Sequence, residues 1–219
     1  MKKTQSQYSF GLASNRKMFR KGMTEGIPIA MGYLAVSFSL GIMAKRAGLS
    51  PFAAFLASFF NNASAGEYAA FSLIMVEASY VEVAIMTFIA NARYLLMSCA
   101  LSQKIPADTP IWKRLIMGYF ITDEIFGVSI LTDGKLDPYY NFGMAAVASP
   151  AWVFGTVFGV VLGNFLPISV VSALSVGLYG MFIAVIIPPA RKNKIVAVLI
   201  IISFVASYIF NKLALFSSI

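Results

Sequence analysis

The stretch that decides the fold is residues 61–68, which read Asn61-Asn62-Ala63-Ser64-Ala65-Gly66-Glu67-Tyr68. It lies midway through residues 51–76, a run that is otherwise apolar enough to cross a bilayer. Polar and small residues at that depth favour a broken helix, because exposed backbone groups are tolerated there only where they line a protein interior or an aqueous path. The sequence therefore predicts that the second membrane segment is broken.

Two further apolar runs carry polar clusters, Asn91-Ala92-Arg93-Tyr94 and Thr122-Asp123-Glu124. A charge in hydrocarbon costs at least about 2.5–3.5 kcal/mol, so it normally faces a protein interior or an aqueous path. Three successive polar clusters favour a transport path over a simple membrane anchor. The candidates for a substrate or proton path are Asn61, Asn62, Ser64, Gly66, Glu67, Tyr68, Asn91, Arg93, Tyr94, Thr122, Asp123 and Glu124.

The composition is that of an integral membrane protein. Of the 219 residues, 59% are hydrophobic and 12% are charged, whereas soluble domains carry about 25% charged residues. We predict an all-α, polytopic membrane helix bundle with about seven transmembrane segments and a single membrane domain over residues 26–219. The apolar runs are 26–44, 51–76, 82–102, 114–131, 140–163, 167–188 and 195–215.

Residues 1–25 form a basic arm ahead of the first apolar run. Six of its residues are Lys2, Lys3, Arg16, Lys17, Arg20 and Lys21. Such a cluster is typical of a cytoplasmic anchor that faces anionic lipid, so the net charge of +8 does not indicate nucleic acid. We expect a multi-pass protein of the cell membrane with a cytoplasmic N-terminus.

The number of crossings is open at this point. If residues 51–76 span the bilayer, the chain crosses seven times; if they double back, it crosses six times and carries a re-entrant hairpin. Both arrangements place ten basic residues inside and six outside, leaving aside Arg93, so the positive-inside rule does not choose. We take seven crossings as the commoner arrangement.

The residues that are missing exclude several kinds of chemistry. The chain has no histidine and one cysteine, Cys99, so we expect no metal, no cofactor and no internal disulfide. An intramembrane enzyme is disfavoured, because Asp123 is the one aspartate within an apolar run. A structural subunit of a larger membrane complex stays as the alternative to a transporter.

The charged residues limit one another's partners. On a helix Arg93 is turned away from Asn91 and needs an anion, either a carboxylate of the chain or that of a substrate. Asp123 and Glu124 are adjacent and point in different directions, so at most one of them faces Arg93. Burial disfavours the charged form of a carboxyl group, so Glu67 is a neutral hydrogen-bonding group or a proton carrier unless cations or donors oppose this.

Glycines recur every fourth residue at Gly155, Gly159 and Gly163. Such a stripe lets another helix approach closely, and its partner is either internal or another subunit. Tyr33, Ser37 and Ser39 are weaker candidates for lining a path, because scattered hydroxyl groups are common in membrane bundles.

Several motifs together resemble the AzlC family, the large subunit of branched-chain amino acid exporters. The resemblance covers nearly the whole chain beyond the arm. It is carried by Gly26-Ile27-Pro28, Gly32-Tyr33, Ser37-Phe38, Ser64-Ala65-Gly66, Asn91 to Ser98, Thr122 to Phe126, Gly155-Thr156 to Gly163, Tyr179 to Ala184 and Pro188-Pro189.

The resemblance implies export of small neutral amino acids such as valine, leucine, isoleucine and methionine. It also implies a small hydrophobic partner subunit of AzlD type and a proton gradient as the driving force. The position after Ser64-Ala65-Gly66 is commonly Gln in such proteins, whereas this chain has Glu67.

Overall fold

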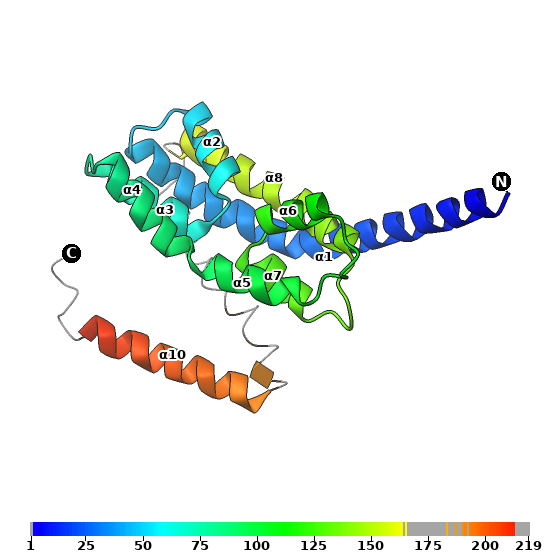
Figure 1. Ribbon diagram of the computed structural model, residues 1–219. Helices are drawn as coiled ribbons and strands as arrows, with labels where there is room; N and C mark the ends of the chain where they lie inside the picture. The colour runs from blue at the N-terminus through cyan, green and yellow to red at the C-terminus, as the bar shows by residue number, and fades with distance from the viewer. Residues whose placement is uncertain are drawn as a thin grey trace. The chain divides into compact units, whose positions relative to one another are not determined.

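The computed structural model describes residues 2–163, 165, 183, 187, 190, 191 and 193–212, with side chains within residues 14–209 (Figure 1). The described residues form helices and no strands, which confirms the all-α prediction. The helices are α1 (Lys2–Arg46), α2 (Pro51–Asn61), α3 (Ser64–Met75), α4 (Tyr80–Asn91), α5 (Arg93–Ser102), α6 (Ile111–Tyr119), α7 (Asp123–Ile130), α8 (Pro138–Leu162) and α10 (Lys194–Lys212).

The chain divides into two compact units, residues 1–178 and 179–219. The first unit contains α1 to α8 and every candidate path residue. The second contains α10, a 19-residue apolar helix with largely exposed side chains. The expected segment over 167–188 lies almost wholly outside the described residues, as do residues 213–215 of the last expected segment.

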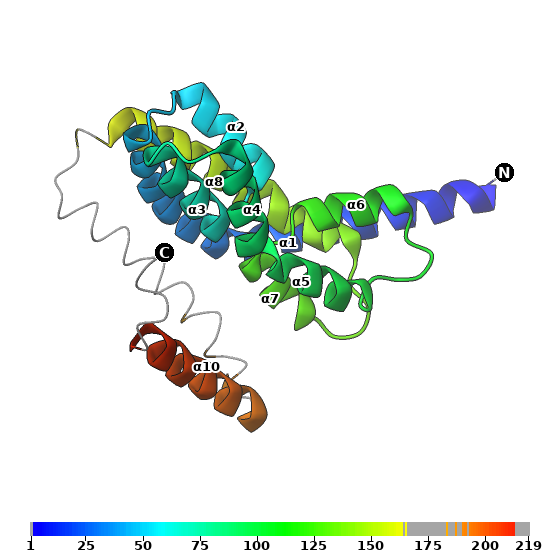
Figure 2. The ribbon, with the colours of Figure 1, turned by 60° about the vertical axis from the view of Figure 1, so that its left-hand side comes forward.

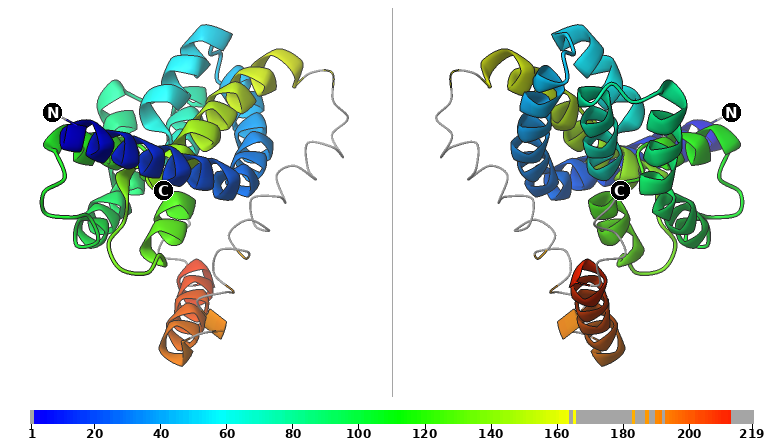
Figure 3. Two further views of the ribbon diagram at one scale, coloured as in Figure 1. Left: turned by 90° about the vertical axis from the view of Figure 1, so that its right-hand side faces the viewer. Right: turned by 90° about the vertical axis from the view of Figure 1, so that its left-hand side faces the viewer.

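The two long helices α1 and α8 pack along each other and run parallel (Figure 2). A Cβ atom on Gly22 would lie 2.0 Å from the carbonyl oxygen of Tyr140, and one on Gly41 would lie 2.1 Å from that of Thr156. Since the residue numbers rise together along both helices, both run from the end that carries the basic arm to the opposite end. Figure 3 views the first unit from the arm end in its left panel and from the opposite end in its right panel.

The glycine stripe of α8 lies against α1, so its partner is internal. A Cβ atom on Gly155 would lie 2.0 Å from Ser37 Oγ, and one on Gly159 would lie 2.1 Å from the carbonyl oxygen of Phe38. Gly163 faces Ile42, whose Cγ1 would lie 2.5 Å from such an atom. Only glycine permits the two backbones to approach this closely.

Three of the expected segments are broken into pairs of short helices. The α2–α3 pair breaks at Asn62, which has a left-handed backbone (φ 46°), and at Ala63, which is extended. This confirms the predicted break in the second segment. Asparagine is one of the few residues that adopt the left-handed conformation readily, which explains why the helix ends there.

The other two breaks differ from the expected continuous helices over 82–102 and 114–131. The α4–α5 pair is bent by 41° at Ala92. The α6–α7 pair separates at residues 120–122, where Thr122 is extended and its hydroxyl oxygen accepts a hydrogen bond from the backbone N–H of Ile125 at 3.3 Å. A threonine followed by two acidic residues is a helix N-terminus signal, so the polar cluster marks the start of a new helix.

Helix length and composition identify two candidate membrane spans within the described residues. They are Ser14–Arg46, which belongs to α1, and Pro138–Leu162, which is α8. The α4–α5 pair passes the same test when its two helices are taken together. The basic arm is helical from Lys2 onwards and continues directly into the first apolar run.

Candidate functional site

The break in the α4–α5 pair holds two polar side chains that reach to different neighbours. Asn91 ends α4, and its Nδ2 donates to Asn61 Oδ1 at 2.8 Å, at the end of α2. Arg93 begins α5, and its Nη2 lies 2.8 Å from Asp123 Oδ2, at the start of α7. One bend therefore joins the two other breaks, through an amide on one side and a guanidinium on the other.

The ends of α2 and α6 also contact each other. The hydroxyl of Tyr119, the last residue of α6, donates to the carbonyl oxygen of Phe59 in the last turn of α2. Their rings lie 6.0 Å apart. The three polar clusters, which are about 30 residues apart in the sequence, thus converge on one region of the first unit.

Gly66 lets the amides come close to the first turn of α3. A Cβ atom at this position would lie 2.5 Å from Asn91 Nδ2 and 2.9 Å from Asn61 Oδ1. Any larger side chain would displace the amide pair from the helix. The Ser64-Ala65-Gly66 motif is therefore explained by a close approach between α3 and the α4–α5 break.

Several buried polar atoms at the breaks have no hydrogen-bond partner among the described residues. They are Asn62 Oδ1, Asn91 Oδ1 and Arg93 Nε; Arg93 Nη2 also makes no hydrogen bond, but it is ion-paired with Asp123. Buried polar groups are nearly always hydrogen-bonded, so each unsatisfied group needs an explanation. These two acceptors and one donor lie at the breaks between the short helices. They suit a small polar ligand that carries both hydrogen-bond donors and hydrogen-bond acceptors.

Both side chains of the Arg93–Asp123 pair are partly exposed on the first unit. The Arg93 side chain is 39% exposed and that of Asp123 is 23% exposed. The ring of Tyr94 lies beside the guanidinium, with its centroid 5.4 Å from the Cζ atom of Arg93. Both side chains are therefore partly exposed, although Nε and Nη2 of Arg93 are themselves buried.

Glu124 points away from this pair and is buried against α1. The hydroxyl of Tyr33 donates to Glu124 Oε2 and lies 2.5 Å from Thr122 Oγ1. Asp123 and Glu124 therefore point in different directions, as expected of neighbours on a helix, and fix the start of α7 to α5 and α1 respectively. Tyr33, a weaker candidate from the sequence, thus contacts two residues of the third polar cluster.

Glu67 lies at the centre of a second, fully buried network. Its exposed fraction is 0%. The indole N–H of Trp152 donates to Oε1 at 2.6 Å, and the hydroxyl of Ser58 donates to Oε2 at 2.8 Å. Ser58 Oγ in turn lies 2.8 Å from Thr156 Oγ1. Among the described residues no cation lies within ion-pair distance of Glu67.

Some site residues were missed by sequence reasoning, and one candidate lies elsewhere. Ser58, Trp152 and Thr156 were not predicted. Trp152 and Thr156 are four residues apart in an apolar run, so their polar groups share one helix face, and this spacing was a usable signal.

Tyr68 is 59% exposed and lies outside the convergent region. Ser64 is half-buried in the first turn of α3. The described residues contain no cluster of potential metal ligands.

An apolar cavity lies beside the ends of α2 and α6. Its volume is about 310 Å³. It is lined by Phe55, Phe59, Phe120, Ala145, Ala146, Ser149, Pro150, Val153 and Phe154. Phe120 stands three residues before Asp123, so the apolar cavity and the charged pair are built on the same break.

The family model described as AzlC protein matches residues 28–166, which include all three breaks. The chain therefore belongs to the AzlC family of membrane proteins.

Among its relatives, an uncharacterized membrane protein of Archaeoglobus fulgidus is 29% identical over 184 residues, covering 83% of this chain and 80% of that protein. Inner membrane protein YgaZ of Escherichia coli K12 is 25% identical over 150 residues, covering 67% of this chain and 61% of YgaZ. An uncharacterized membrane protein of Helicobacter pylori 26695 is 26% identical over 152 residues, covering 68% and 65% of the two chains. No solved structure matches the chain.

Proposed function

We propose that this chain is a secondary transporter that exports branched-chain and similar small neutral amino acids. The observation that carries the proposal is the α4–α5 break, which presents Asn91 and Arg93 between the interrupted ends of two other helix pairs. Interrupted helices at membrane depth are the usual place for substrate and ion sites in secondary transporters. A structural subunit would not need accessible charges there.

The charged pair suits the two ends of an amino acid. A zwitterion in a low-dielectric site needs a partner for each of its charges. Arg93 can take the carboxylate and Asp123 the ammonium group, since both side chains are partly exposed. Free acceptors on Asn62 and Asn91 can receive the remaining ammonium hydrogens.

The apolar cavity suits the side chain of such a substrate. Its volume of about 310 Å³ exceeds that of an aliphatic side chain, and its lining is almost entirely apolar and aromatic. A charged or strongly polar side chain would lose its hydration there without gaining a partner. This difference favours substrates with apolar side chains, such as valine, leucine, isoleucine and methionine, over polar ones.

The proposal includes a partner and a driving force. The exporter is completed by a small hydrophobic membrane subunit of AzlD type, it works in the cell membrane, and it is driven by the proton gradient. These three points rest on the family resemblance and on the apolar side chains that the described helices expose.

The test is export of preloaded labelled leucine from cells that lack their own exporters. The chain is expressed with and without the small subunit, and each culture is repeated with a protonophore. We expect efflux that requires the small subunit and is blocked by the protonophore. Absence of efflux of all four amino acids, with both subunits in the membrane, would refute the proposal.

A matched pair of variants ties the efflux to the site. Asp123→Asn removes the charge that faces Arg93, whereas Asp108→Asn removes a charge from the loop before α6. We expect the first variant to lower efflux at least about tenfold and the second to leave it unchanged. Normal flux from Asp123→Asn at normal expression would exclude Asp123 from the binding site.

A further inference from the structure

The loops before and after the α6–α7 pair lie together at one face of the first unit. Lys135 Nζ donates to the carbonyl oxygen of Gln103 at 2.9 Å, and the backbone N–H of Leu136 donates to that of Lys104 at 2.8 Å. Lys104 Nζ donates to the carbonyl oxygen of Thr132. If the α6–α7 pair crossed the bilayer, these loops would be separated by about 30 Å.

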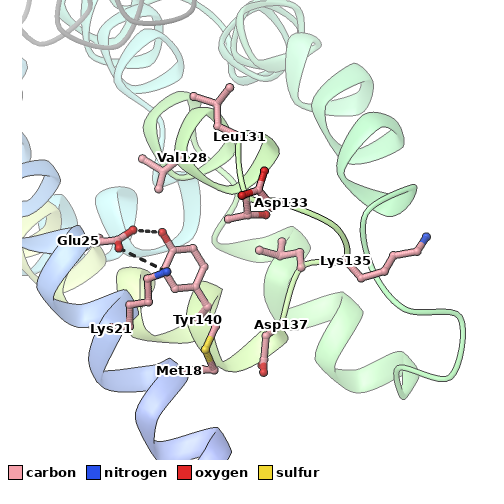
Figure 4. A pocket seen from close by; sticks show the side chains of 11 residues that line it. Met18, Lys21, Glu25, Val128, Leu131, Asp133, Lys135, Asp137 and Tyr140 are labelled. Carbon is pink, nitrogen blue, oxygen red and sulfur yellow. Dashed lines mark hydrogen bonds and ion pairs between the residues drawn. The ribbon is translucent and has the colours of Figure 1, made fainter.

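This face is the one where α8 begins, beside Lys21 and Glu25 of α1. The hydroxyl of Tyr140, in the first turn of α8, donates to Glu25 of α1, and Lys21 lies 5.5 Å from the centroid of the Tyr140 ring. Figure 4 shows these side chains around a cavity of about 490 Å³ that is also lined by Val128 of α7 and by Leu131, which directly follows α7. The α6–α7 pair therefore leaves the arm face and returns to it.

The α4–α5 pair is long enough to reach the opposite face. Its helices contain 12 and 10 residues, which at 1.5 Å per residue is about 33 Å, close to the thickness of the hydrocarbon core. Since α5 ends at the arm face, α4 begins at the opposite face.

The α2–α3 pair begins and ends at that opposite face. Residues 47–50 connect the end of α1 to the start of α2, and residues 76–79 connect the end of α3 to the start of α4. Figures 1 and 2 show α3 turning back toward the end of the unit where α1 finishes.

Each of the four short helices is long enough to reach about the middle of the bilayer from one face. α2 and α3 contain 11 and 12 residues, and α6 and α7 contain 9 and 8. At 1.5 Å per residue each reaches about 12–18 Å, roughly half of the hydrocarbon thickness. The contact between Tyr119 and Phe59 joins the two tips where they meet.

We propose that α2–α3 and α6–α7 are two re-entrant hairpins that enter the bilayer from opposite faces and hold the candidate site between their tips. Three crossings, α1, α4–α5 and α8, surround them. Each hairpin covers the site from one face, so α6–α7 is the element that opens to the arm face, and the cavity of Figure 4 is the mouth on that side. The arrangement holds whatever the transported molecule is.

The basic residues then orient the unit in the membrane. The arm face carries ten of them, which are Lys2, Lys3, Arg16, Lys17, Arg20, Lys21, Lys104, Lys113, Arg114 and Lys135. The opposite face carries two, Lys45 and Arg46. This asymmetry assigns the arm face to the cytoplasm by the positive-inside rule, in agreement with the cytoplasmic N-terminus expected from the basic arm.

The experiment is cysteine labelling of the full chain in intact cells, and it needs no transport. Cys99→Ser gives a background without thiols, into which single cysteines are placed by Leu49→Cys, Val76→Cys, Ala107→Cys and Asp133→Cys. A membrane-impermeant maleimide is added before or after permeabilisation. We expect positions 49 and 76 to react in intact cells, and positions 107 and 133 to react only after permeabilisation.

Each other pattern overturns a defined part of the proposal. Seven crossings would expose position 107 to the outside and hide position 76. A single hairpin at α2–α3 would expose position 133 while hiding position 107. A complete reversal, with 107 and 133 reactive in intact cells and 49 and 76 protected, would overturn the cytoplasmic assignment of the arm face. Failure of leucine export would leave the labelling pattern unchanged, so the two proposals fail independently.

Discussion

Glu67 and Asp123 occupy the same kind of position and have different surroundings. Each lies in the first turn of a short helix that follows a break, where the helix dipole favours a negative charge. Glu67 is wholly buried and bound by the neutral donors of Trp152 and Ser58. Asp123 is partly exposed and bound by the cation of Arg93. The sequence pattern alone therefore does not reveal which carboxyl group can meet a ligand.

The different surroundings of Glu67 and Asp123 indicate that the two carboxyl groups have different roles. The Glu67 network joins α2, α3 and α8 inside the core, where neutral donors can hold a carboxyl group in place without a counter-ion. The Arg93–Asp123 pair joins two breaks at a partly exposed position, where in the proposed transporter each charge exchanges its partner for an oppositely charged group of the substrate. We therefore expect Glu67 to act on stability and Asp123 to act on transport.

The largest effect is expected at the accessible pair. Asp123→Asn keeps the shape of the side chain and removes the charge that would bind the substrate ammonium group. A hydrogen bond to a charged group contributes about 1.5–3 kcal/mol, so leucine efflux should fall by roughly 10- to 150-fold. The measurement is the initial efflux rate per amount of protein in the membrane. An unchanged rate would remove the distinction between the two carboxyl groups.

Glu67→Leu should act on the fold instead. It leaves the indole N–H of Trp152 and the hydroxyl of Ser58 buried without their acceptor, and each such group costs about 1–3 kcal/mol of folding free energy. The thermal unfolding midpoint of the detergent-solubilised protein should fall clearly below that of the wild type. The control is Asp123→Asn, which should unfold near the wild-type temperature.

Glu67→Gln sharpens the comparison with a smaller expected effect. Glutamine keeps one acceptor for Trp152 and can donate to Ser58, so the network can be rebuilt with the opposite hydrogen-bond direction. We expect near-normal unfolding temperature and leucine efflux within about twofold of the wild type, since the rebuilt network keeps its hydrogen bonds. A folded variant without efflux would show that Glu67 carries a proton during transport.

The smallest effect is expected at Tyr68, the neighbour of Glu67. Its side chain is 59% exposed and reaches none of the groups at the breaks. Tyr68→Ala should leave both the efflux rate and the unfolding temperature close to those of the wild type. A strong loss of efflux at normal stability would mean that the substrate path runs along the outer face of α3.

Much of the fold followed from local patterns in the sequence. The apolar runs predicted a helical membrane bundle, and Asn61 to Gly66 predicted the break in the second segment, because asparagine and glycine at that depth interrupt a helix. Thr122-Asp123-Glu124 also carried a start signal for a helix. It was interpreted as a polar cluster within one continuous helix, so the α6–α7 break was missed.

The candidate site could be predicted only in part. Charges within apolar runs identified Glu67, Arg93, Asp123 and Glu124, since charges at that depth need partners. The partners of Glu67 were not predicted, because Ser58, Trp152 and Thr156 are ordinary residues in membrane helices. Their role depends on α2, α3 and α8 meeting, and no local pattern contains that information.

By itself, the sequence determined that the chain is a helical membrane protein with polar groups in three apolar runs and a break in the second, because hydrophobicity and helix-ending residues act locally. Only the tertiary structure decided which polar groups meet. Asn91 pairs with Asn61 and Arg93 with Asp123 because short helices from different parts of the chain are brought to one bend. Glu67 is enclosed because the glycines of α1 and α8 let those helices close the core around it. Such contacts arise between distant segments, so they depend on packing and not on any one segment.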